Sequence, residues 1–257
     1  MKFGVCASID QAQIAYNVGF DYLECTVESL KPEKSKQEIK GVLTKFSESP
    51  IPVETFNIFI PRDLKVTGES VDYDRIHRYL EKSLERVSDV GGDTIVFGSG
   101  GARTINEGFS KERAEHQIIH FLDIVADYAE PLGVTIVIEP LYKKASNMIK
   151  NLPEAVEIAK QVNRQSIKVL ADFFHMVEEN DPLENIIKYS DDIRHIHTSD
   201  NYYPPGSGTY PFPYFVECIK HSNYNGRVSI ECIWNDFEKE VKDALAFVKS
   251  QFHSLET

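Results

Sequence analysis

The chain has 257 residues, and 42% of them are apolar, so it can bury a full core. Asp and Glu together number 40 against 28 Lys and Arg, which gives a formal net charge of −12 at pH 7. Such a charge repels nucleic acid backbones and anionic membrane surfaces. We therefore expect no nucleic acid and no membrane among the partners of this protein.

The sequence shows no sign of export or membrane insertion. Its first residues reach Asp10 without the apolar stretch that a signal peptide needs, and no later stretch is long enough to span a bilayer. The four cysteines, Cys6, Cys25, Cys218 and Cys232, form no CxxC pair. We expect a soluble, cytoplasmic protein whose cysteines are reduced and mostly buried.

Short β-rich runs alternate with longer amphipathic stretches, which is the pattern of strand-helix units around a parallel sheet. We expect strands at Lys2–Cys6, Tyr22–Thr26, Val53–Phe56, Thr94–Phe97, Val134–Ile138, Ile167–Ala171, Ile193–His197 and Arg227–Glu231. We expect helices at Ile9–Val18, Ser35–Ser47, Asp74–Val90, Lys111–Leu132, Leu152–Val162, Pro182–Tyr189, Phe212–His221 and Phe237–Phe252. Eight such units predict one α/β domain over residues 1–257, a (β/α)8 TIM barrel. A doubly wound open sheet is the alternative fold.

Four of the expected strands end in a residue that can bind a metal: Glu139, Asp172, His197 and Glu231. In a barrel, the chemistry takes place at the carboxyl ends of the strands. Successive members of this set are separated by about one strand-helix-strand repeat, so their side chains can converge at one height. Each acid taken alone could instead cap the following helix. The four together predict a metal site.

The donor atoms of this site indicate the kind of metal. Three carboxylates and one imidazole favour Mn²⁺, Mg²⁺ or Co²⁺, with Zn²⁺ as an alternative. His195 and His197 share one face of a strand, and His195 lies roughly 7 Å deeper in the barrel. His197 is therefore the expected ligand, whereas His195 is expected to pack or to orient other groups. His175 follows the sixth strand on an expected loop that can direct it at a substrate.

Several stretches carry a resemblance to a known family: Phe56–Pro61, Phe97–Arg103, Ile138–Leu141, Ala171–Met176, His195–His197 and Ile230–Glu231. Through them the sequence resembles the xylose isomerase-like sugar phosphate isomerase/epimerase superfamily. It is most similar to the ketose 3-epimerase and hydroxypyruvate isomerase branches, over nearly the whole chain. The resemblance implies that the same four residues bind the metal, that His175 touches substrate oxygens, and that the chain forms a homodimer or homotetramer.

The sequence also departs from these relatives. Ala145 stands where ketohexose 3-epimerases have a substrate-binding glutamate, and Tyr203 stands where they have an arginine. Both missing groups grip one end of a ketohexose. The resemblance therefore implies the class of reaction more firmly than the substrate.

These features predict a metal-dependent isomerase or epimerase of a small sugar or sugar-like hydroxy-carbonyl compound. A divalent ion chelated by carbonyl and hydroxyl oxygens stabilises the enediolate that proton removal creates. Glu139 and Glu231 are the expected catalytic residues. Acting from opposite faces of the sugar, one abstracts the proton and the other returns it, which gives epimerisation. One carboxylate acting alone gives aldose-ketose isomerisation.

Other functions fit parts of the sequence. A lyase on the same barrel, dehydrating an inosose or dehydroshikimate, is the main alternative, because an enediolate beside a leaving hydroxyl can eliminate it. A metal-dependent DNA repair nuclease needs several metals, more histidine ligands and a basic surface, so the charge and the ligand count argue against it. A binding module without metal is the non-enzymatic alternative.

Three further residues are predicted to contact the substrate. Arg103 follows a glycine-rich run that we interpret as a tight loop, and with Lys143 and Lys144 it offers positive charge to an acidic substrate. Trp234 is expected either to wall the pocket or simply to pack. Tyr203 belongs to a turn-rich loop that can serve as a lid or a subunit contact.

Overall fold

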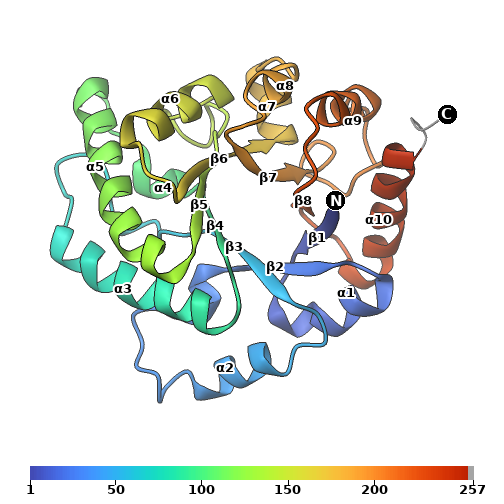
Figure 1. Cartoon of the computed structure of the whole chain (residues 1–257), viewed down its shortest axis with the longest axis horizontal. Coiled ribbons are helices and arrows are strands. Elements are labelled where there is room, and N and C mark those ends of the chain that lie inside the picture. Colours follow the sequence, from blue (N-terminus) through green and yellow to red (C-terminus); the bar gives the residue numbers. More distant parts are fainter. Residues whose placement is uncertain (254–257) are drawn as a thin grey trace.

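Eight parallel strands form a closed barrel in the computed structural model, which describes residues 1–253 (Figure 1). The strands are β1 (Lys2–Cys6), β2 (Tyr22–Thr26), β3 (Val53–Asn57), β4 (Thr94–Phe97), β5 (Thr135–Ile138), β6 (Ile167–Asp172), β7 (Ile193–Thr198) and β8 (Arg227–Ile230). Each strand pairs with the next, and β8 pairs with β1 to close the ring. The predicted TIM barrel is therefore confirmed, and the open sheet is wrong.

Helices surround the barrel on its outside (Figure 1). They are α1 (Ala12–Val18), α2 (Lys40–Ser47), α3 (Tyr73–Asp89), α4 (Gly100–Arg103), α5 (Lys111–Ala129), α6 (Leu152–Val162), α7 (Phe173–Glu179), α8 (Asn185–Lys188), α9 (Phe212–His221) and α10 (Phe237–His253), with short 3-10 helices η1 (Ile9–Gln11), η2 (Val27–Leu30) and η3 (Glu130–Leu132). Among the residues described, none of these helices combines the length and apolar composition that crossing a bilayer requires.

Local sequence signals account for the helix boundaries. Asp72 and Asn151 cap α3 and α6, because each side chain accepts a hydrogen bond from a backbone N–H in the first turn. The first half of the helix expected at Ser35–Ser47 is wrong, since α2 begins only at Lys40. Two short helices, α4 and α7, lie where loops were expected. The four cysteines are free, and two of them, Cys25 and Cys218, are buried.

The interior of the barrel is unusually polar. Val96, Val137 and Leu170 form a small apolar cluster on neighbouring strands β4, β5 and β6. The other inward positions of β2, β3, β7 and β8 hold polar side chains that are fully or almost fully buried: Tyr22, Glu24, Thr55, Asn57, His195, His197 and Ser229. Buried polar groups are costly unless they are hydrogen-bonded. This half of the interior is therefore organised by hydrogen bonds, as described below.

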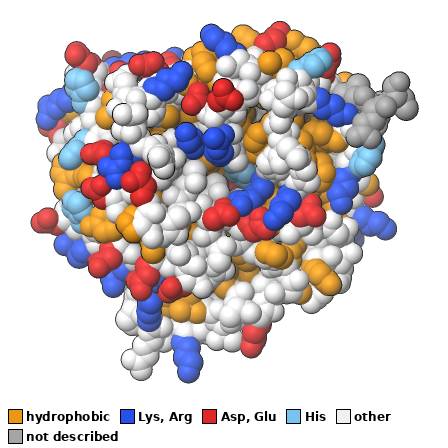
Figure 2. All heavy atoms as spheres, viewed as in Figure 1, with side chains coloured by type: hydrophobic (Ala, Val, Ile, Leu, Met, Phe, Trp, Pro, Cys, Tyr) orange, Lys and Arg blue, Asp and Glu red, His pale blue; other side chains and the backbone are white. Residues whose placement is uncertain are grey.

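Ion pairs link the amino ends of several strands. Arg227, at the start of β8, contacts Asp93 and Glu54, and Lys2 contacts Glu54 from β1. Across the face drawn in Figure 2, acidic and basic side chains lie interspersed rather than gathered by sign. These pairs tie together strands at the end of the barrel opposite to the carboxyl ends, where the candidate site lies.

The absence of a side chain at Gly4 makes room for the Tyr22 ring inside the barrel. A Cβ atom at Gly4 would lie 2.2 Å from Tyr22 Cζ, whereas one at Gly41, in α2, would meet nothing within 4 Å. We predict that Gly4→Ala lowers the free energy of unfolding by about 1–3 kcal/mol through overpacking. Gly41→Ala should leave it unchanged or raise it slightly, because alanine favours the helix. Urea denaturation of the two variants measures the difference, and equal stabilities would contradict this packing.

Candidate metal centre

The structure brings the four predicted metal ligands together. Asp172 ends β6, His197 lies in β7, and Glu139 and Glu231 directly follow β5 and β8. One ligand atom from each residue lies within 4.8 Å of the corresponding atoms of the others. The carboxyl ends of four consecutive strands thus surround one point in the mouth of the barrel.

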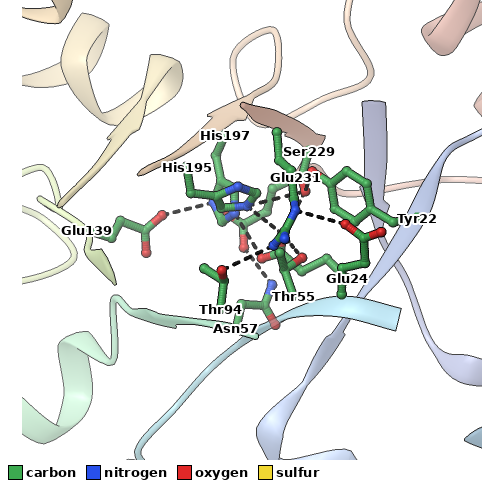
Figure 3. Close-up of polar contacts among 12 residues, drawn as sticks. Tyr22, Glu24, Thr55, Asn57, Thr94, Glu139, His195, His197, Ser229 and Glu231 are labelled. Carbon is green, nitrogen blue, oxygen red and sulfur yellow. Dashed lines mark hydrogen bonds and ion pairs between the residues drawn. The ribbon is translucent and has the colours of Figure 1, made fainter. Parts of the chain in front are cut away.

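The Nδ1 atom of His197 lies at the centre of this group. It is 2.9 Å from Glu231 Oε2, 3.2 Å from Glu139 Oε1 and 3.8 Å from Asp172 Oδ2. In Figure 3, Glu139 reaches toward His197 from the opposite side to Glu24. Ionised carboxylates only accept hydrogen bonds, so these three oxygens repel one another unless a positive charge lies between them. Their donor chemistry suits a hard or borderline divalent cation.

A fifth residue, Glu24 in β2, determines which nitrogen of His197 faces the carboxylates. Its Oε1 atom lies 2.9 Å from His197 Nε2, and both side chains are fully buried. An ionised carboxylate cannot donate, so Nε2 carries the proton and donates to Glu24. The lone pair of a neutral His197 is therefore on Nδ1, directed at the site. Carboxylates commonly hold a metal-binding histidine in this way.

Glu24 is itself held by several donors. Its Oε2 accepts hydrogen bonds from Ser229 Oγ at 2.6 Å, His195 Nε2 at 2.8 Å and Thr55 Oγ1 at 2.9 Å. Burial raises the pKa of Glu24, but His197 and His195 outweigh burial and hold that pKa well below its usual value. The network thus keeps Glu24 ionised. His195 binds Glu24 from deeper in the barrel and lies outside the ligand group, as predicted.

Burial and charge act in opposite directions on the groups of the site. Burial and the nearby Glu231 raise the pKa of Glu139. Burial also raises that of Glu231, but His197 outweighs it and the pKa of Glu231 is lowered. Burial lowers the pKa of His197, while Glu24 and Glu231 raise it, and the net pKa lies well above the usual value. A proton and a divalent cation therefore compete for Nδ1 of His197.

Another grouping, of Cys6, Glu24 and His197, also brings three metal-capable atoms within 4.8 Å. It suits a metal poorly. Nε2 of His197 and the Glu24 carboxylate are already joined by a hydrogen bond. Burial, and then the charge of Glu24, raise the pKa of Cys6 well above its ordinary value, so it stays a thiol.

Asp172 has two roles, one for each oxygen. Its Oδ1 accepts a hydrogen bond of 2.7 Å from the backbone N–H of His175 and so caps α7, while Oδ2 faces His197. The helix cap, one of the two roles expected for this residue, is therefore present, and Oδ2 stays free for the other, the predicted metal ligand. The expected loop is wrong, because His175 lies within α7, where it is buried and stacks on Tyr142.

A cavity of about 690 Å³ opens beside the four predicted ligands. Glu139 and Glu231 line it, whereas Asp172 and His197 do not. Asn57 also lines it and donates from Nδ2 to Glu231 Oε1 at 3.1 Å. The volume falls within the range of about 300–1,000 Å³ that is usual for small-molecule sites. Two of the four predicted ligands, Glu139 and Glu231, are therefore in position to contact a molecule in the cavity.

The structure assigns Arg103 a role different from the predicted substrate contact. Its side chain is fully buried, and its guanidinium donates to the carbonyl oxygens of Phe97 at 3.1 Å, Glu139 at 2.7 Å and Ile149 at 3.4 Å. Burial lowers the pKa of Arg103 to about 10, which leaves it charged at neutral pH. Arg103 thus fixes the ends of β4 and β5 behind Glu139 and has no access to the cavity.

Two other predicted substrate contacts lie away from the cavity. Trp234 packs edge-to-face on Phe237 and is not among the residues that line the cavity. Tyr203 lines a different hollow, together with Phe247. Its neighbour Tyr202 lies beside His175 instead, with ring centroids 6.3 Å apart. Burial, and then the charges of Glu231, Asp172 and Glu139, raise the pKa of Tyr202. Tyr202 has a positive φ of 69°.

Sequence reasoning missed three residues of the site. The sequence contained an indication of Glu24, because this charged residue lies in a mostly apolar strand, on the same face as Tyr22. Asn57 extends β3 by one residue and reaches Glu231. Gly98 provides space, since a Cβ atom there would lie 2.1 Å from Glu139 Oε2. The tight loop predicted for the glycine run thus admits the carboxylate of a predicted ligand.

We predict that Glu24→Gln weakens divalent-metal binding by about 10- to 100-fold, as loss of a carboxylate behind a metal-binding histidine does. A glutamine amide can donate to Nε2 of His197 and so moves the imidazole proton to Nδ1. Isothermal titration calorimetry with Mn²⁺ measures the change. Glu69→Gln, at an exposed position, is the matched control. An unchanged affinity in Glu24→Gln would contradict the role given to Glu24.

Comparison with known proteins places this geometry in a family. The chain is 27% identical over 195 residues to 3-dehydro-D-guloside 4-epimerase of Escherichia coli (strain K12), covering 71% of this chain and 74% of that protein. It is 34% identical over 109 residues to D-psicose 3-epimerase of Ruminiclostridium cellulolyticum (strain ATCC 35319 / DSM 5812 / JCM 6584 / H10), covering 42% of this chain and 37% of that protein.

Solved structures share the whole fold. The apo crystal structure of a 3-keto-D-glucoside 4-epimerase from E. coli matches with a TM-score of 0.82 and 25% identity, over 97% of this chain and 99% of that one. A D-psicose 3-epimerase crystallised in the presence of D-fructose matches with a TM-score of 0.86 at 21% identity, over 98% and 99% of the two chains. Residues 12–251 match the family described as xylose isomerase-like TIM barrel, and the chain belongs to that family.

Proposed function

We propose that this chain is a divalent-metal-dependent isomerase or epimerase that transfers a proton on a small sugar-like hydroxy-carbonyl substrate. One observation carries the proposal. Of the four predicted ligands, only Glu139 and Glu231 line the cavity, so two carboxylates are placed to act on a bound molecule. Asp172 and His197 do not line the cavity, so they serve the ion and not the substrate.

The four ligands would hold one Mn²⁺, Mg²⁺ or Co²⁺ ion, with Zn²⁺ as the alternative. When bound, such an ion polarises a carbonyl and stabilises negative charge on the oxygens of an enediolate. The ligand atoms fit this role because one nitrogen and three carboxylate oxygens converge within 4.8 Å. A buried set of this charge needs a cation to balance it.

Each cavity-lining carboxylate divides its two oxygens between two tasks. Glu139 directs Oε1 at His197, while Oε2 lies against Gly98 on the cavity wall. Glu231 directs Oε2 at His197, while Asn57 holds Oε1. One oxygen of each can therefore bind the ion and the other can accept a proton from carbon. If one carboxylate removes the proton from carbon and the other delivers a proton to the opposite face, the configuration of that carbon inverts. If one carboxylate both removes and returns the proton, the carbonyl group moves to the neighbouring carbon.

The relatives support this class of reaction. Their names include two epimerases, given above, and a 2-oxo-tetronate isomerase of Haemophilus influenzae (strain ATCC 51907 / DSM 11121 / KW20 / Rd), 23% identical over 90% of this chain and 90% of that protein. They confirm the prediction of an enzyme. For this chain, carbohydrate metabolism, a cytoplasmic location and assembly into dimers or tetramers stay predictions.

His175 and Tyr202 are our candidates for substrate contacts near the carboxylates. His175 acts electrostatically on both Glu139 and Glu231. Its Nδ1 accepts a hydrogen bond from the backbone N–H of Tyr142 at 3.4 Å, which leaves Nε2 to donate. Tyr202 lies beside it, with ring centroids 6.3 Å apart. Both could donate to hydroxyl or carbonyl oxygens of a sugar.

We predict that the metal-loaded protein exchanges solvent deuterium into carbon beside the carbonyl of a ketose or of hydroxypyruvate. Glu139→Gln and Glu231→Gln should each lower the exchange rate by about 10²- to 10⁴-fold at saturating Mn²⁺, as loss of a general base does. Proton NMR follows the exchange in each variant.

Asp172→Asn is the matched control for this experiment. Asp172 faces the ion but not the cavity, so excess Mn²⁺ should restore exchange in this variant but not in the two glutamine variants. Unchanged exchange in both glutamine variants would overturn the proposal. So would loss of a substrate hydroxyl with the ultraviolet absorbance of an enone, because this indicates a lyase.

A further inference from the structure

The cavity beside the metal centre has a cationic side. Arg62, Lys65 and Lys144 line the same cavity as Glu139 and Glu231. Arg62 and Lys65 come from the loop between β3 and α3, and Lys144 comes from the loop between β5 and α6. The three positive charges thus reach one cavity from two separate segments of the chain.

Two of these cations lack a partner within the described part of the chain. Arg62 and Lys144 form no hydrogen bond or ion pair with any of residues 1–253. Two other arginines differ, since Arg75 contacts Glu33 and Asp63 and Arg164 contacts three carboxylates. The guanidinium of Arg62 therefore remains available to a molecule in the cavity.

Two glycines hold these cations in place. A Cβ atom at Gly101 would lie 2.4 Å from Arg62 Cγ, so the stem of Arg62 packs directly on Gly101. The Lys65 ammonium donates to the carbonyl oxygen of Gly101. A Cβ atom at Gly100 would lie 2.8 Å from the carbonyl oxygen of Ala145, next to Lys144. The glycine run thus lets both cation-bearing segments approach the wall of the cavity.

The opposing charges in the cavity are few. Glu28, an exposed residue of η2, is the other acid among its lining residues besides Glu139 and Glu231. Those two face the metal position, where a divalent ion compensates their charge. Asp63, next to Arg62, is already paired with Arg75. The side formed by Arg62, Lys65 and Lys144 therefore keeps a net positive charge.

From this arrangement, and resting on the proposed function, we infer that the substrate carries an anionic group, a carboxylate or a phosphate, at the end remote from the reacting carbon. Arg62, Lys65 and Lys144 bind that group while the hydroxy-carbonyl end lies at Glu139 and Glu231. The substrate class is then an acidic or phosphorylated sugar. A neutral ketose would leave these cations without a partner.

Three compounds that share carbons 1 to 5 and differ at carbon 6 test the inference: D-fructose, D-fructuronate and D-fructose 6-phosphate. Deuterium exchange with the Mn²⁺-loaded protein gives kcat/KM for each. We expect at least one of the anionic compounds to exceed D-fructose by about tenfold or more. The preferred anion then distinguishes a carboxylate from a phosphate.

Variants show whether the cationic side causes the preference. Arg62→Ala should raise KM for the preferred anion by about tenfold and leave KM for D-fructose unchanged. Gly101→Ala should act in the same direction, because it displaces the Arg62 stem and leaves every charge present. Arg78→Ala is the matched control, since Arg78 is an exposed arginine of α3 outside the cavity. Circular dichroism establishes that each variant is folded.

The outcomes separate this inference from the proposed function. Exchange with D-fructose at least as fast as with both anions would overturn the inference and leave the proposed function standing. An equal fall in kcat/KM for D-fructose and for the anion in Arg62→Ala would overturn the inference too. No exchange with any compound, in a protein that binds Mn²⁺, would instead overturn the proposed function.

Discussion

The tautomer of one buried histidine determines the arrangement of the whole site. Nε2 of His197 donates to Glu24, so Nδ1 faces Glu139, Asp172 and Glu231. Three carboxylates can gather at this point in the mouth of the barrel only if positive charge lies among them. Both a proton on His197 and a divalent ion supply that charge. The divalent ion can bind all four side chains at once, whereas a proton cannot.

The polar half of the barrel interior supports this one imidazole. Ser229, Thr55 and His195 all donate to Glu24, and Tyr22 bonds Ser229 at 2.8 Å. Replacing such a network by apolar residues often stabilises a fold, so its presence here is better explained by the site than by stability. The network joins strands β2, β3, β7 and β8 and keeps Glu24 ionised beneath the metal position.

The sequence predicted the strands and the convergence of Glu139, Asp172, His197 and Glu231 for a shared reason. Each strand is a short apolar run, and all eight predicted strands agree with the structure to within one residue at each end. Once the strands are placed, a barrel forces their last residues together, so Glu139, Asp172, His197 and Glu231 could be found without coordinates.

The residues that sequence reasoning missed or misplaced depend on contacts between distant segments. Glu24 acquires its role from partners on three other strands, and Arg103 acquires its role from carbonyl groups of the neighbouring loops. No local pattern records such contacts. Helix α7 was missed because a cap and a ligand at Asp172 were expected as alternatives, whereas one oxygen caps the helix and the other faces His197.

Anomalous diffraction from crystals grown with Mn²⁺ tests the central claim most directly, because it locates the ion without assuming any activity. The account predicts one strong manganese peak at about 2.0–2.2 Å from His197 Nδ1, in contact with Glu139, Asp172 and Glu231, with Nε2 still bonded to Glu24. A peak on Nε2, or no peak among these four residues at saturating Mn²⁺, would contradict it.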